Sequence, residues 1–127
     1  MLYLIKLYEN KPKDYTMKKI IITAMLVLIL SLAAAHPAAK VNGRYDSKTQ
    51  LFYLSFQHGV RDAADHYIGN VNLWVNGKAV LTQLLYLQEN DKGGNLVYKI
   101  PSLKPGDQIL VKTECNKGGV KTYKLTL

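Results

Sequence analysis

Stretches of alternating apolar and polar residues, separated by turn residues, cover the chain from about residue 40 to its end. A period of two is typical of strands with one buried face, and this part of the chain contains no convincing helical period. The pattern therefore predicts an all-β unit of about seven short strands. They are expected at residues 41–45, 50–57, 67–76, 79–87, 96–100, 108–114 and 120–127.

Turn residues between these stretches support the same reading. Asn76-Gly77 supplies the positive φ angles of a two-residue hairpin, and Pro105-Gly106 stands where a type II turn places proline and glycine. Glycine-containing turns are also expected at 90–94 and 116–119. Seven short strands in about 90 residues suggest an immunoglobulin-like β-sandwich.

The core of this sandwich is expected to contain aliphatic side chains and Trp74. The chain has one cysteine, so no disulfide within the chain can join the two sheets. In the third strand we expect Val71, Leu73 and Val75 on one face and Ile68 and Trp74 on the other. In the second strand the candidate core residues are Leu51, Tyr53 and Phe56.

The N-terminal part has the three-part design of a secretory signal. Lys18 and Lys19 precede a mainly apolar run, which ends in small residues with an A-x-A arrangement at Ala33 and Ala35. A membrane-spanning helix is the alternative, but the 16 residues from 20 to 35 fall short of the roughly 20 that a bilayer requires. Cleavage before His36 is therefore expected, and cleavage one residue earlier is the alternative.

These features predict three segments. Residues 1–16 are an upstream extension without function if translation begins at Met17, residues 17–35 are a signal peptide, and residues 36–127 are one exported domain. Such a domain is periplasmic or extracellular and has no membrane association after cleavage. Its oligomeric state does not follow from the sequence.

The 92 residues after the predicted cleavage site suffice for one domain with a modest core. They contain 12 Lys and Arg against 7 Asp and Glu, so the surface is basic. The lysines are scattered singly among strands and turns, without a basic run or interleaved aromatic residues. Nucleic-acid binding is therefore not indicated.

Four residues could hold a metal. The three histidines of the chain, His36, His58 and His66, all lie in the mature part, and Cys115 lies where a strand meets a turn. Strand ends can converge at one pole of a sandwich, and three imidazoles with a thiolate suit iron, zinc or copper. The alternative is three surface histidines and a buried cysteine that bind nothing.

Other chemistry has little support in the sequence. There is no nucleophile elbow, glycine-rich phosphate loop or CxxC pair. Asp62 and Asp65 flank the loop between the second and third strands and could form an acid/base pair, but carboxylates on a solvated loop are far commoner. Hydrolase chemistry is therefore not expected.

The order of several motifs resembles the iron-binding domain of desulfoferrodoxin and the superoxide reductases. The motifs are His58, the run 65–68 (DHYI), the strand 71–75 (VNLWV), the turn 103–107 (LKPGD) and the segment 114–119 (ECNKGG). This resemblance covers nearly the whole mature chain. It implies an immunoglobulin-like β-sandwich with one non-haem iron, held by four equatorial histidines and an axial cysteine thiolate.

The resemblance assigns ligands residue by residue. His66 matches the histidine of the H-[HY]-I motif, Cys115 the axial cysteine of C-N-x-H-G, and His58 the histidine that opens the H-P-x loop. His36 stands for the first histidine ligand. The resemblance thus implies an iron site that could reduce superoxide with electrons from a donor protein, and copper or zinc are the alternative metals.

Two departures affect the implied activity. Gly118 replaces the histidine that follows the cysteine by three residues, and alanines occupy the positions of the glutamate and lysine that precede the first histidine. The resemblance links that lysine to superoxide reduction. Cleavage before His36 would free an α-amine that could supply the missing nitrogen ligand, as in small periplasmic copper-binding β-sandwich proteins.

A second resemblance points to a different class of function. The chain is also similar to the β-sandwich partner subunit of the thiosulfate-oxidation carrier, which shares the H-[FY]-I strand, the N-G-K hairpin found here at 76–78 and a late G-D strand at 106–107. That resemblance implies a metal-free interaction module. The set of three histidines and one cysteine distinguishes the two readings, because an interaction module has no physical need for it.

Overall fold

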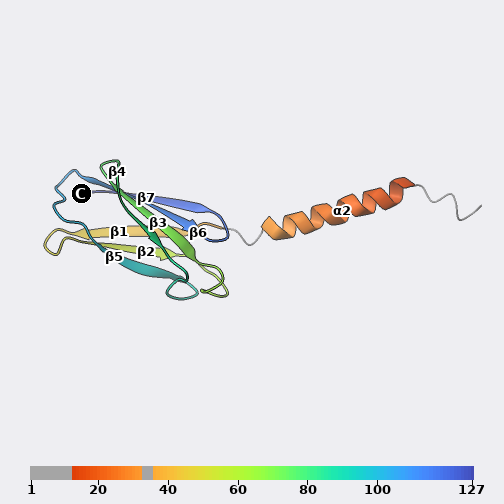
Figure 1. Cartoon of the computed structure of the whole chain (residues 1–127), viewed down its shortest axis with the longest axis horizontal. Helices are drawn as coiled ribbons and strands as arrows, with labels where there is room; N and C mark the ends of the chain where they lie inside the picture. Colours follow the sequence, from red (N-terminus) through yellow and green to blue (C-terminus); the bar gives the residue numbers. More distant parts are fainter. Residues whose placement is uncertain (1–12, 33–35) are drawn as a thin grey trace, which may run out of the picture. The chain divides into compact units, whose positions relative to one another are not determined.

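The computed structural model describes residues 13–32 and 36–127. The chain divides into two compact units, Met1–Ala34 and Ala35–Leu127. In the first unit, helix α2 extends over Lys13–Leu32 (Figure 1). Among the described residues, no helix has the length and apolar character needed to span a bilayer. Residues 1–12 and the predicted cleavage site at 33–35 lie outside the described residues, and the export signal stays a prediction.

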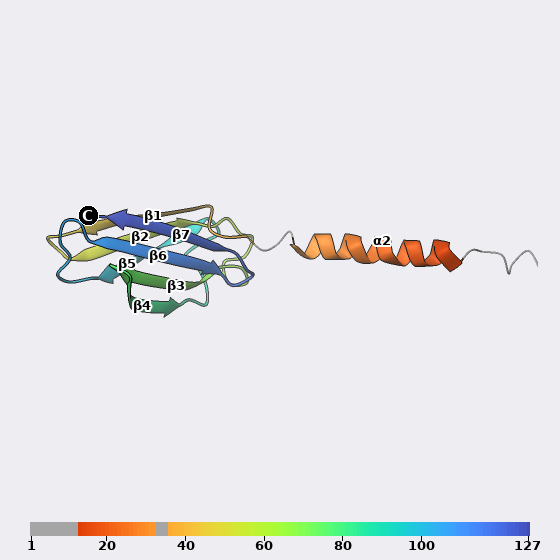
Figure 2. The ribbon, with the colours of Figure 1, turned by 90° about the horizontal axis from the view of Figure 1, so that it is seen from above.

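The second unit is a sandwich of seven strands, which confirms the all-β prediction (Figures 1 and 2). One antiparallel sheet has three strands in the order β1-β2-β5, and the other has four in the order β4-β3-β6-β7. The strands are β1 (Lys40–Asp46), β2 (Leu51–Gln57), β3 (Ile68–Val75), β4 (Lys78–Leu84), β5 (Gly93–Lys99), β6 (Gln108–Cys115) and β7 (Val120–Thr126).

Both predicted tight turns form. Asn76 and Gly77 have φ angles of 49° and 79° and connect β3 to β4, with Val75 paired to Lys78 in the hairpin. Gly106 has a φ of 92° in the turn before β6, and Asp107 closes that turn by donating its N–H to the Lys104 carbonyl.

The predicted core of β2 was partly wrong. Phe52, Leu54 and Phe56 are buried, with exposed fractions of 0%, 1% and 4%, whereas Leu51 and Tyr53 are only half-buried. Inward positions in a strand recur every second residue, so Leu51 and Tyr53 cannot share a face with Phe56. Phe56 was predicted correctly, and the even positions form the buried face.

The predicted faces of β3 also need correction. Ile68 is fully buried together with Val71 and Leu73, because a register shift between Ile68 and Asn70 changes the alternation there. Trp74 is only half-buried and lies outside the core cluster. Its neighbours Leu73 and Val75 face the core, so the side chain of Trp74 points to the other face of the strand. The core is aliphatic and phenylalanine-based instead.

Two strand boundaries differ from the predictions by three residues. β4 ends at Leu84 rather than at 87, and β5 begins at Gly93 rather than at 96. Gly94 was predicted in a turn, but it faces the Phe56 ring, and a Cβ at this position would lie 2.8 Å from that ring. The absent side chain therefore lets β5 pair with β2 over a bulky core residue.

Candidate metal centre

The strand register brings the four predicted ligands to one end of the sandwich. The first residue of β1 pairs with the last of β2, and the first residue of β3 pairs with Cys115, the last of β6. His36 precedes β1, His58 follows β2 directly, and His66 lies two residues before β3. All four residues therefore lie at these paired strand ends.

The three imidazole rings form a nearly equilateral triangle. Their centroids are 4.7 Å apart for His36 and His58, 4.9 Å for His36 and His66, and 4.8 Å for His58 and His66. One ring nitrogen of each residue lies within 4.8 Å of the others. Sγ of Cys115 lies 3.0 Å from Nε2 of His66. The three histidines are thus brought together, and Cys115 contacts His66.

Backbone amides around the turn 116–119 hold Cys115. Its N–H donates to the Gly119 carbonyl and its carbonyl accepts the Gly118 N–H, both at 3.0 Å. The N–H of Lys117 points at Sγ over 3.3 Å. These three contacts fix the backbone and the sulfur of Cys115 against the turn.

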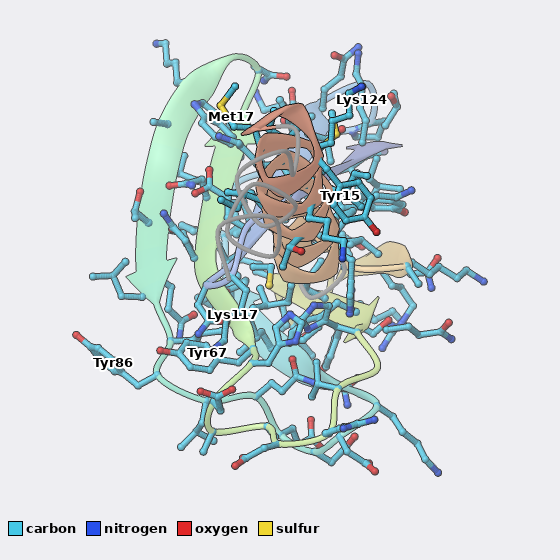
Figure 3. All side chains as sticks on the ribbon, turned by 90° about the vertical axis from the view of Figure 1, so that its right-hand side faces the viewer. Tyr15, Met17, Tyr67, Tyr86, Lys117 and Lys124 are labelled. Atoms are coloured by element: carbon cyan, nitrogen blue, oxygen red, sulfur yellow. The ribbon has the colours of Figure 1, made fainter. Side chains whose placement is uncertain are left out.

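Asn116 and Lys117 hold the segment around His66. The Asn116 side chain accepts the Tyr67 N–H at 2.9 Å and donates to the Asp65 carbonyl at 2.8 Å. Nζ of Lys117 pairs with the Asp65 carboxylate at 3.1 Å. In Figure 3, Tyr67 and Lys117 are labelled at this end of the molecule. The residues after Cys115 thus fix both neighbours of His66.

His58 is fully buried. Its Nδ1 lies 2.9 Å from the side-chain oxygen of Gln88, and its Nε2 lies 3.2 Å from the His36 carbonyl oxygen. The backbone N–H donates to the Lys92 carbonyl at 2.9 Å. Both the ring and the backbone of His58 are therefore fixed by the interior.

Gly119 determines where the His36 segment can lie. It has a φ of 98°, and a Cβ built on it would collide with backbone atoms of Pro37 and His36. Only glycine leaves room for the His36-Pro37 backbone against the turn that follows Cys115. The position of His36 therefore depends on a residue that is remote in sequence.

The surroundings of His66 lower its pKa. Burial, followed by the nearby His58 and His36 rings and the Lys117 cation, lowers the pKa of His66 below its ordinary value, while Asp65 acts in the opposite direction. A neutral imidazole has a lone pair available for a metal ion. The lowered pKa of His66 therefore favours the neutral ring that ligation requires.

Asp62 and Asp65, the candidate acid/base pair, make local contacts instead. The Asp62 carboxylate accepts the Ala64 N–H at 2.9 Å, and Asp65 pairs with Lys117, so both carboxylates serve the loop. Gly118, which stands where the sequence resemblance places a histidine, has a φ of 111°. A histidine there would be strained, since side chains rarely adopt that conformation.

Gln88 and Asn116 were missed from the sequence. Neither amide is a strong metal ligand, and Gln88 is 30 residues from the His58 that it contacts. Of the two, only Asn116 could have been found from the sequence, because it follows Cys115 directly in the segment 114–119. Both residues bond to atoms adjacent to the cluster and set its geometry.

The donor set fits a transition metal. Nε2 of His66 and Sγ of Cys115 lie 3.0 Å apart, close enough for both to reach one ion at bond lengths of about 2.1 Å for nitrogen and about 2.3 Å for sulfur. Imidazole and thiolate suit iron, zinc and copper and disfavour magnesium and calcium. The residues present could therefore hold one such ion.

Comparison with known proteins identifies the fold. No protein-family model matches the chain, and none of the curated proteins matches it. The solved structure of the superoxide reductase (1Fe-SOR) of Giardia intestinalis is similar, with a TM-score of 0.55 and 13% identity over 72% of this chain and 99% of that chain. A second similar structure is the superoxide reductase (neelaredoxin) of Ignicoccus hospitalis, with a TM-score of 0.46 and 16% identity over 77% of this chain and 83% of that chain. The similarity to the Giardia structure shows that the sandwich has the superoxide reductase fold.

Proposed function

We propose that this protein binds one non-haem iron through His36, His58, His66 and Cys115 and acts as a superoxide reductase-like redox protein. The observation that carries the proposal is the 3.0 Å approach of His66 to Cys115 within a cluster of three imidazoles. This cluster lies at one end of a superoxide reductase fold, which supports iron over the other candidate metals.

The chemistry of the proposed reaction is simple. Bound ferrous iron would supply the one electron that, with two protons, converts superoxide to hydrogen peroxide, and an electron-donor protein would then restore the ferrous state. The thiolate of Cys115 would donate charge toward the ion, and the three imidazoles would hold it as neutral ligands. His66 is already favoured in its neutral form by burial and neighbouring charge.

Lys117 offers a cation beside the centre. Its charge acts on His66, and its ammonium group is paired with Asp65, the residue before His66. The sequence lacks the lysine that the family resemblance places before the first histidine. Positive charge near a site increases the encounter rate of a small anion such as superoxide, so we propose that Lys117 supplies part of this attraction.

Metal content and spectroscopy test the iron centre directly. The full chain and a form that begins at His36 are loaded anaerobically with ferrous iron and then oxidised. We expect one iron per chain and a visible thiolate-to-ferric charge-transfer band, which is lost in Cys115→Ser. Superoxide removal is then measured with the loaded protein. Iron without that band, or a band that survives in Cys115→Ser, would contradict the proposed ligand set.

Loading with copper and zinc separates the alternatives. Stoichiometric binding of copper or zinc but not iron would favour a periplasmic metal-binding protein. If none of the three metals binds, the reading as a metal-free interaction module, similar to the thiosulfate-oxidation carrier partner, takes its place.

We also propose that the protein is exported from the cytoplasm. Processing of the signal at 17–35 before His36 would free its α-amine next to the imidazole cluster, where it could act as an additional nitrogen ligand. N-terminal sequencing of the protein recovered from cell fractions tests this point. A first residue other than His36 would remove the α-amine from the ligand set.

A further inference from the structure

Gln88 is one of the few buried polar side chains among the described residues, with an exposed fraction of 3%. It lies between β4 and β5. Its side-chain nitrogen is 2.8 Å from the His58 carbonyl and 2.8 Å from the Asn90 carbonyl. Its side-chain oxygen is 2.9 Å from Nδ1 of His58 and 3.3 Å from the N–H of Ile68. All four contacts of this amide are thus to protein atoms.

These partners fix the orientation of the amide. Carbonyl oxygens only accept hydrogen bonds, so the Gln88 nitrogen must face the carbonyls of His58 and Asn90. The Gln88 oxygen must then face Nδ1 of His58, and because this oxygen also only accepts, Nδ1 must carry a proton. In the neutral ring, the lone pair is consequently on Nε2.

The surroundings of Nε2 support a cation there. In this tautomer the Nε2 lone pair lies 3.2 Å from the His36 carbonyl oxygen, which also only accepts. Two acceptors in contact repel each other, and the burial of the His58 ring strengthens this repulsion. A cation at Nε2 offsets this repulsion, whereas a proton at Nε2 would require His58 to be charged.

We infer that Gln88 is a positioning residue for the metal centre: it locks His58 as the Nδ1–H tautomer and thereby presents Nε2 to the ion. The same oxygen binds the N–H of Ile68, the first residue of β3, which lies two positions after His66. The Gln88 backbone N–H donates to the Ala63 carbonyl at 3.1 Å. One residue thus connects His58 and the start of β3 through its side chain, and the loop before His66 through its backbone.

The effect on metal binding follows from the general behaviour of such partners. A residue that orients a ligating histidine typically contributes about 10- to 100-fold to metal affinity. The metal part of this inference rests on the proposed function, whereas the tautomer of His58 does not. Each part therefore has its own measurement.

The first measurement is the tautomer of His58 in the metal-free full chain, read from the nitrogen chemical shifts of the imidazole by NMR. We expect Nδ1–H in the wild type and in Gln88→Glu, where one carboxyl oxygen still accepts from Nδ1 and the other, when protonated, can donate to one of the two carbonyls. We expect Gln88→Met to lose this preference. A doubly protonated or Nε2–H ring in the wild type would overturn the inference.

The second measurement is the affinity for ferrous iron and for zinc in the same variants. Gln83→Met is the matched control, since Gln83 is a half-buried glutamine whose oxygen accepts the Tyr98 hydroxyl at 2.7 Å and contacts no ligand. We expect a loss of about 10- to 100-fold in Gln88→Met, a smaller loss in Gln88→Glu and no change in Gln83→Met. Equal losses in Gln88→Glu and Gln88→Met would mean that Gln88 only supports packing. A wild type that shows the expected tautomer but binds no metal would instead contradict the proposed function.

Discussion

Nε2 of His66 lies 3.0 Å from Sγ of Cys115, although 49 residues separate them in the chain. The pairing of Ile68 with Cys115 at the ends of β3 and β6 brings the two segments together. Asn116 then bonds to the backbone on both sides of His66, at Asp65 and at Tyr67. The contact therefore follows from sheet register and one amide side chain.

Replacement of the sulfur should affect the metal-bound protein most. Cys115→Ser removes the thiolate but preserves a small side chain at a site with 7% exposure. A ligand that binds only the native state raises stability in proportion to the logarithm of its affinity. We therefore expect the rise in Tm on adding ferrous iron to shrink in the variant, as measured by calorimetry with and without metal. Equal Tm losses in the two conditions would count against ligation.

A glycine pair tests the placement of His36. Gly119 and Gly77 have φ angles of 98° and 79°, but a Cβ at Gly77 meets no atom within 4 Å. Both alanine variants should incur the left-handed strain of about 1–2 kcal/mol. Only Gly119→Ala should also displace the His36-Pro37 backbone, so its unfolding free energy in urea and its metal affinity should fall further. Matching results for the two variants would show that His36 does not depend on Gly119.

Acid should destabilise the metal-free protein through His66. Folding lowers the pKa of His66, so below its unfolded value of about 6.5 the unfolded chain binds more protons than the folded chain. The contribution of His66 to the unfolding free energy is complete above that value and is lost as the pH falls through the pKa of the folded state. Unfolding free energies between about pH 5 and 8 should therefore decline toward acid, and the decline should be shallower in His66→Gln. An unchanged slope in the variant would assign the decline to other groups.

Two leucines of β2 test the buried face of that strand. Leu54 is 1% exposed, whereas Leu51 is half-buried. Leu54→Ala should cost about 2–5 kcal/mol of unfolding free energy, because it removes apolar contacts and leaves a cavity. Leu51→Ala should cost clearly less. Chemical denaturation of both variants measures the difference, and the opposite ranking would restore the face predicted from the sequence.

The strands were predictable because their signals are local. Alternation and turn residues such as Asn76-Gly77 act within a few residues, and they predicted seven strands close to those observed. The faces of β2 and β3 were less predictable, since Phe52 and Tyr53 are both aromatic neighbours and either could point inward. The register shift near Ile68 depends on pairing with β6, which no local pattern reveals.

The candidate site was predictable only as a set of residue types. Histidine and cysteine are uncommon enough in this chain to be singled out, and the structure clusters the three histidines, with Cys115 in contact with His66. The contacts that fix them come from residues with no chemical signature of their own. Gln88 is an ordinary glutamine in the sequence, and it becomes significant only because folding buries it against His58.

Gly119 lies so close to His36 and Pro37 that a side chain there would collide with them. This contact joins two segments that are synthesised far apart in time. The proposed ligands extend from residue 36 to residue 115, and the last of them lies at the end of the penultimate strand. A growing chain cannot join His36 to the turn after Cys115 until the first six strands have been synthesised. Ion capture by the full ligand set must then follow the synthesis of β6, and an occupied centre would mark a molecule whose β1 and β6 ends have already met.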